Sequence, residues 1–159
     1  MALTSYVSGL IVQSVPTRGV MKVDRFTADG TFTPPAGVFY AVAYIRAGGG
    51  GAGDSSSGTG GNSSVAFAGG TITATGGNPA NTTAGSVSVA GATNSGQGAW
   101  ARASTGAYQS KAGDGALITA GGAVTPGTGI AVVVGAGGTA GTNGGAAGGS
   151  GYVYIEYLA

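Results

Sequence analysis

The stretch VFYAVAYIRAGGGG, residues 38–51, joins the two kinds of sequence that make up this chain. Residues 38–46 are aromatic, β-branched or small, which favours a strand, and successive side chains of a strand point to opposite faces. One face would carry Val38, Tyr40, Val42 and Tyr44, and the other Phe39, Ala41, Ala43 and Ile45. Because neither face is polar, the sequence predicts a long strand covered on both sides, which ends at four consecutive glycines.

Further short apolar runs separated by turn residues predict more strands. They lie at residues 25–27, 31–33, 63–67, 71–75, 86–89, 130–134 and 152–157. Asp29 and Gly30 separate the first two runs, and such a pair is a strong hairpin signal. Apolar residues do not recur at helical spacing over three turns. We therefore predict an all-β fold with almost no helix, a small β-sandwich-like domain with long glycine-rich loops.

Glycine accounts for 36 of the 159 residues, and part of it recurs every third residue. This spacing links Gly135, Gly138, Gly141 and Gly144, and after a shift of one residue it returns at Gly145, Gly148 and Gly151. Three residues per turn is the repeat of a polyproline II helix, and glycine lets such chains pack closely. Two interpretations stand: packed polyglycine-II-like segments, or flexible linkers. The strand predicted directly after Gly151 favours the packed form.

The composition restricts the classes of function. Charged residues are 7% of the chain and the net charge is +1, so no field attracts nucleic acid or an anionic membrane. The hydrophobic fraction of 42% argues against a disordered chain. The sequence has no run of about 20 apolar residues, so we predict no membrane span. Its start has no basic segment followed by an apolar one, so we predict no signal peptide.

Catalytic chemistry finds few candidate groups. Histidine and cysteine are absent, which excludes Ser-His-Asp and Cys-His sites, disulfides, and histidine or thiolate metal sites. Asp29 and Asp114 each precede a glycine, where turn formation explains them. We predict neither an enzyme nor a bound cofactor or metal. Arg46, at the end of a predicted strand, is expected to neutralise Glu156 or Asp54.

Residues 1–22 differ from the rest of the chain, since they contain only Gly9 and Gly19. The stretch YVSGLIVQSV, residues 6–15, is apolar and β-branched and ends before Pro16, so we expect an extended arm. The arm could pack on its own domain or attach to another subunit. Its candidate contact residues are Tyr6, Leu10, Ile11, Val12 and Val15. The predicted organisation is an arm, 1–22, followed by a glycine-rich β domain, 23–159.

The sharpest candidate binding surface is the stretch WARASTGAYQSK, residues 100–111. It contains the only tryptophan, and Trp, Tyr and Arg are the residues most often found as binding hot spots. The candidate contacts are Trp100, Arg102, Tyr108, Gln109 and Lys111. Three interpretations stay open: contact with a receptor, contact with a subunit or partner, and packing in the core. The tyrosines on the predicted strands are expected to pack on the sheets.

Several motifs in one order resemble the glycine-rich domain of bacteriophage tail-fibre and tail-tip proteins. The first half of the chain contains FTADGTFT at 26–33, PAGV at 35–38 and AGGGG at 47–51. The second half contains VTPG at 124–127, VGAGG at 134–138, and GGSG at 148–151 followed by YVYIEY at 152–157. The resemblance covers residues 26–159, apart from about 80–120, and none of it falls on residues 1–25.

The resemblance implies a phage virion protein made in the host cytoplasm, often one that takes part in host adsorption, and commonly a trimer. Implied partners are other tail proteins and a bacterial surface receptor such as a pilus, lipopolysaccharide or protein. The short chain favours a tail-tip or baseplate protein over a long fibre. One alternative is a purely structural tail connector without receptor contact. A remote alternative is a glycine-rich ice-binding protein.

Overall fold

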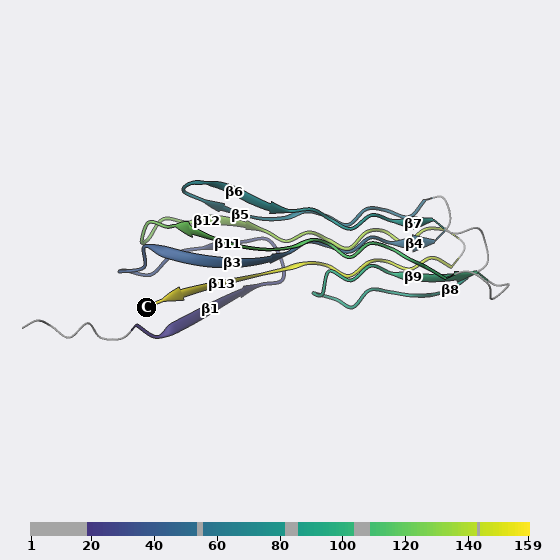
Figure 1. Ribbon diagram of the computed structural model, residues 1–159, viewed down its shortest axis with the longest axis horizontal. Coiled ribbons are helices and arrows are strands. Elements are labelled where there is room, and N and C mark those ends of the chain that lie inside the picture. Colours follow the sequence, from purple (N-terminus) through teal and green to yellow (C-terminus); the bar gives the residue numbers. More distant parts are fainter. Residues whose placement is uncertain (1–18, 54–55, 82–85, 104–108, 143) are drawn as a thin grey trace, which may run out of the picture.

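The computed structural model describes residues 19–53, 56–81, 86–103, 109–142 and 144–159. This part of the chain contains strands and extended segments but no helix, and hence no helix able to cross a membrane. The molecule is elongated, with the larger sheets at one end and smaller sheets at the other (Figure 1). Between them the chain passes back and forth in extended segments that lie side by side (Figure 1).

Two four-stranded antiparallel sheets form a sandwich at one end, as the sequence predicted. The first sheet has the order β1 (Met21–Phe26), β13 (Tyr152–Leu158), β3 (Tyr40–Arg46) and β11 (Leu117–Ala123). The second has the order β2 (Gly30–Phe32), β12 (Ile130–Val133), β5 (Ser63–Phe67) and β6 (Gly70–Ala74). The predicted all-β, sandwich-like fold is therefore confirmed.

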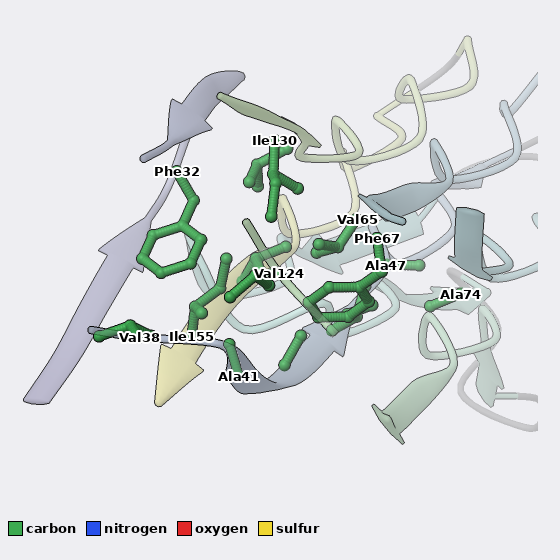
Figure 2. Close-up of a cluster of buried hydrophobic side chains, with 14 residues drawn as sticks. Phe32, Val38, Ala41, Ala47, Val65, Phe67, Ala74, Val124, Ile130 and Ile155 are labelled. Atoms are coloured by element: carbon green, nitrogen blue, oxygen red, sulfur yellow. The ribbon is translucent and has the colours of Figure 1, made fainter. Parts of the chain in front are cut away.

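Alternating side chains of both sheets fill the space between them (Figure 2). Ile45, Val153 and Ile155 come from the first sheet, and Phe32, Val65 and Val132 come from the second. All six side chains are almost fully buried. Because burial of one such side chain is worth about 1.5–3 kcal/mol, this core is the main source of stability in the sandwich.

The glycine-rich segments are packed against each other through backbone hydrogen bonds. Residues 47–52 follow β3, and their six N–H groups donate in turn to three neighbouring segments, with a repeat of three residues. The amides of Ala47 and Gly50 donate to the carbonyls of Ala116 and Gly113 in the segment before β11. Those of Gly48 and Gly51 donate to Gly61 and Gly58 in the segment before β5. Those of Gly49 and Ala52 donate to Gly149 and Ala146 in the segment before β13. This three-residue repeat is the one that polyproline-II-type chains have.

Three other segments donate to the carbonyls of the same central segment. Gly77 and Ala80 bond Gly48 and Gly51, Gly138 and Gly141 bond Gly49 and Ala52, and Ala99 bonds Gly50. The central segment 47–52 therefore has six neighbours, which we call, together with it, the glycine bundle: residues 47–52, 58–62, 75–80, 91–99, 112–116, 134–142 and 144–151. In these segments the packed interpretation is correct, and the flexible-linker interpretation is not.

Small sheets lie at the far end of the glycine bundle (Figure 1). One is a parallel pair, β4 (Ala52–Gly53) and β7 (Ala80–Asn81). The other, here called the tip sheet, has the antiparallel order β10 (Gln109–Lys111), β9 (Trp100–Ala103) and β8 (Ser86–Val89). Alanines fill the space beneath them: Ala52, Ala80, Ala99, Ala101, Ala112 and Ala146 form a buried cluster.

The predicted hairpin at Asp29 is wrong. β1 pairs with β13 in the first sheet, whereas β2 pairs with β12 in the second, so residues 27–29 cross from one sheet to the other. The Asp29 carboxylate accepts a hydrogen bond of 2.8 Å from the Val134 amide, which holds this crossing against the second sheet. The turn signal was real, but the strands beside it found distant partners.

One predicted strand limit also changes, and one strand of the sandwich was not predicted. The strand expected at residues 38–46 begins at Tyr40, because Val38 turns into the core and Phe39 is 67% exposed. Strand β11 was not expected, since Gly121 and Gly122 interrupt its apolar pattern. These glycines leave room for two aromatic rings, Tyr40 on one side of the sheet and Phe67 on the other.

Candidate functional site

The tip sheet presents a row of three large side chains. Val89, Trp100 and Lys111 lie opposite each other on adjacent strands β8, β9 and β10. Trp100 is 45% exposed, whereas the next residue, Ala101, is buried against the alanine cluster. The alternation along β9 therefore directs Trp100 away from the packed interior and leaves its ring available for contact.

Lys111 lies beside the ring of Trp100, with Nζ 5.8 Å from the ring centroid, a geometry suited to a cation–π interaction. The same Nζ is 2.9 Å from the Asp114 carboxylate, which also accepts a hydrogen bond of 2.8 Å from the Gly98 amide. Arg46 Nη2 approaches Asp114 at 3.8 Å. The Gly98 hydrogen bond first, and then Lys111, hold the pKa of Asp114 below its ordinary value.

The structure brings some of the predicted contact residues together. Trp100 and Lys111 are cross-strand neighbours, and Arg102 and Gln109 are paired in the same β9–β10 register. Tyr108 lies outside the described residues. So do the arm residues Tyr6, Leu10, Ile11, Val12 and Val15, and their contact roles stay predictions. Met21 and Lys22, assigned to the arm from the sequence, are part of β1.

Two residues of this site were not anticipated. Val89 joins the row only because β8 pairs with β9, and no local pattern indicates that pairing. Asp114 was interpreted as a turn residue, although its position three residues after Lys111 could have suggested the ion pair. In the described residues the ion pair of Arg46 is with Asp114, which corrects the expected pairing with Glu156, whereas the alternative partner Asp54 lies outside the described residues.

A second surface lies at the opposite end of the molecule, on the outer face of the first sheet. The Tyr44 hydroxyl donates to Glu156 at 3.2 Å, and this hydrogen bond raises the pKa of Tyr44. Arg25 lies 5.5 Å from the ring centroid of Tyr154, whose ring is 4.8 Å from that of Tyr152. The predicted packing of tyrosines on the strands thus falls mostly on this outer face, except for Tyr157, which contacts Phe32 in the core.

Among the described residues, both surfaces offer rings, apolar side chains and a few hydrogen-bonding groups. Such surfaces are suited to binding another molecule by stacking and burial. No family model, curated protein or solved structure matches this chain. Its function must therefore be argued from the geometry and from the motifs in its sequence.

Proposed function

We propose that this chain is a virion structural protein of a phage tail tip, fibre or baseplate, and that its tip sheet contributes to binding a host receptor. The observation that supports the proposal most is the separation of two surfaces along one rigid molecule. The described chain enters at Gly19 and leaves at Ala159, both in the sandwich, where Val20 and Ala159 exchange two backbone hydrogen bonds. The tip sheet lies at the far end (Figure 1).

This layout suits an adhesin because the two ends can have different partners. The sandwich end can be held by other tail proteins, while Trp100 and Lys111 face outward at the other end. Residues on the edge of a rigid scaffold are a common place for recognition. The tryptophan ring supplies a flat face that can stack on a sugar or a side chain, and Lys111 supplies a hydrogen-bond donor beside it. A trimer would present three such rows together.

The proposal is tested by binding of the purified protein to candidate host cells. We expect saturable binding by the wild type and at least about a tenfold loss, or about 1.4 kcal/mol, in a Trp100→Ala, Lys111→Ala variant. Phe39→Ala is the matched control, since it removes an exposed ring of the opposite end. Unchanged binding by a folded double variant would overturn the assignment of the tip sheet.

A connector without receptor contact is the second candidate, and the exposed aromatic face of the first sheet favours it. In that case the folded wild type would bind no host cell, and the sandwich would bind another tail protein. Loss of tail assembly in Phe39→Ala, with no cell binding by the wild type, would support the connector.

A further inference from the structure

The two outer faces of the sandwich differ in chemistry. The second sheet presents small and hydroxylated side chains: Thr31, Ser64, Ala66, Thr71, Thr73, Ala131 and Val133. The first sheet presents mostly large apolar and aromatic ones, Met21, Val23, Tyr40, Val42, Tyr44, Leu117, Tyr152, Tyr154 and Leu158, together with Arg25, Arg46, Thr119 and Glu156. An antiparallel sheet with one solvated face normally has polar residues on that face, as the second sheet does. The first sheet therefore has the composition of a covered face.

No described segment of the chain covers this face. Val23, Tyr40, Leu117 and Leu158 are each more than half exposed. Two shallow clefts follow one another along the strands. The first, about 340 Å³, is lined by Met21, Tyr40 and Leu158 among others, and the second, about 380 Å³, by Val23, Tyr44 and Tyr154 among others; Glu156 borders both. Contiguous apolar surface of this kind marks a site of interaction.

The residues that precede the described chain have the matching properties. The sequence has no charged side chain before Arg18, so residues 1–17 would bring no side-chain charge of their own onto the apolar face. Val7, Ile11 and Val15 recur every fourth residue. In an extended chain, residues four apart point to the same side, and their Cα atoms lie about 13 Å apart. Leu158 and Tyr154 on β13 are also four residues apart, so the two spacings match.

Reach and direction are also suitable. The segment joins the sandwich at Gly19, directly before β1, the strand that carries Met21 and Val23 of the two clefts. The seven residues between Ile11 and Gly19 let their Cα atoms lie up to about 26 Å apart when extended, and Pro16 and Gly19 favour a reversal of the chain between them. A tethered segment competes at an effective concentration in the millimolar range, on the order of that set by short flexible linkers, which favours it over a second copy.

We propose that residues 6–15 of the same chain cover the outer face of the sheet β1-β13-β3-β11, with Val15 in the first cleft and Ile11 in the second. This inference does not depend on receptor binding by the tip sheet, but it assigns to the arm the sheet face that favours the connector. The arm would then cover the outer face of the apolar strand predicted at residues 38–46, whose other face lies in the core. The arm would also pack on its own domain and would not serve as a free attachment segment.

The absence of cysteine from the chain allows a clean test with pairs of introduced cysteines. Ile11→Cys is combined with Val23→Cys in the second cleft, or with Val133→Cys on the outer face of the other sheet as the matched control. Under mild oxidation we expect an intramolecular disulfide to form at least about tenfold faster in the first pair, at a rate independent of protein concentration. Equal rates for the two pairs, or disulfide-linked dimers whose rate rises with concentration, would overturn the proposal.

A second measurement does not need the disulfide to form. Ile11→Asp with Val15→Asp would release the arm and at least double the binding of a dye that reports exposed apolar surface. The control, Ser8→Asp with Ser14→Asp, adds the same charges at positions of opposite parity, and dye binding should stay at the wild-type level. Equal dye binding by both double variants and the wild type would contradict the proposal, provided that thermal melts show all three folded.

Discussion

Six of the seven segments of the glycine bundle join directly onto strands of the β-sandwich, yet opposite features hold the two regions together. β3, β5, β6, β11, β12 and β13 each continue directly into a segment of the bundle. In the sandwich, large side chains such as Phe32 and Ile155 fill the space between two sheets. In the bundle, the backbones approach so closely that a Cβ atom at Gly50 would overlap the carbonyl oxygen of Asn78.

The difference shows that one elongated molecule can be held together by side-chain burial in one part and by backbone hydrogen bonds in another, where glycine replaces the larger residues. The sandwich gains stability from apolar burial, which is non-directional and tolerates exchanges of similar volume. The bundle depends on backbone hydrogen bonds at about 2.9 Å, whose geometry leaves no room for an added methyl group. The sandwich should therefore suffer from loss of atoms, and the bundle from their addition.

The largest effect is expected from Gly50→Ala. The new methyl group would collide with the backbone of Asn78 and Gly77, which cannot move without breaking hydrogen bonds of the bundle. We expect a loss of more than about 4 kcal/mol in the free energy of unfolding, measured by urea denaturation. Gly69→Ala is the control, because no atom lies within 4 Å of its added Cβ, and it should change stability by less than about 1 kcal/mol. Similar losses in the free energy of unfolding for Gly50→Ala and Gly69→Ala would contradict the view that the bundle has no room for added atoms.

The converse change in the sandwich is Ile45→Ala. Ile45 is fully buried between the sheets, so its truncation should cost about 2–5 kcal/mol through lost burial and a residual cavity. Val133→Ala removes an exposed side chain of the second sheet and should cost less than about 1 kcal/mol. Thermal or urea unfolding of both variants measures the difference, and a cost below that of Val133→Ala would refute the assigned core.

The junction between the two regions is tested by Ser63→Ala. The buried Ser63 hydroxyl donates to the Arg46 carbonyl and accepts from the Gly135 amide, each at 2.8 Å, and so links the end of β3 to the start of a bundle segment. Its removal takes a hydrogen bond from each backbone group in a buried place and should cost about 1–3 kcal/mol. Ser64→Ala, on the outer face of the same strand, is the control, and its effect should stay below about 0.5 kcal/mol.

The smallest effect is expected from Asp114→Asn, which weakens the contact between the tip sheet and the bundle. The pKa of Asp114 is lower in the folded state than its ordinary value of 3.8. Its stabilising contribution is therefore present above about pH 4 and is lost as the pH falls through the folded-state pKa. Because Asp114 is partly exposed, we expect at most about 1 kcal/mol at pH 7. Unfolding measured from pH 7 to pH 2 should show a shallower pH dependence in the variant; identical slopes would exclude this role.

Much of the sandwich could be predicted because its strands carry a local signal. The aliphatic and aromatic runs at 130–133 and 152–158 are strands as expected, and the turn at Ala68-Gly69 joins β5 and β6. The repeat of glycine at every third residue indicated the packed extended segments. Of the candidate contact residues, Trp100 and Lys111 were chosen from the sequence by residue type alone, since tryptophan is unique in the chain, and the structure places them side by side.

Strand partners could not be predicted, because they depend on contacts far apart in the sequence. Asp29-Gly30 is a good hairpin signal, but the residues that flank it belong to different sheets. Phe26 lies in β1 of the first sheet and Phe32 in β2 of the second, and both contribute to the core between the sheets, so their strands do not pair. The position of Val89 beside Trp100 depends on the pairing of β8 with β9, and that of Asp114 beside Lys111 depends on the contact of the tip sheet with the bundle. The pairing of β8 with β9 has no signal in the local sequence.

By itself, the sequence determined the class of the strongest segments: runs of aliphatic and aromatic residues indicated strands, and glycine at every third residue favoured extended segments that pack through the backbone. The tertiary structure decided which segments are neighbours. Each hydrogen bond of the bundle joins nearly identical backbone groups, so glycine itself carries no information about its partner, and six of the seven segments are brought together by the sandwich strands to which they are attached.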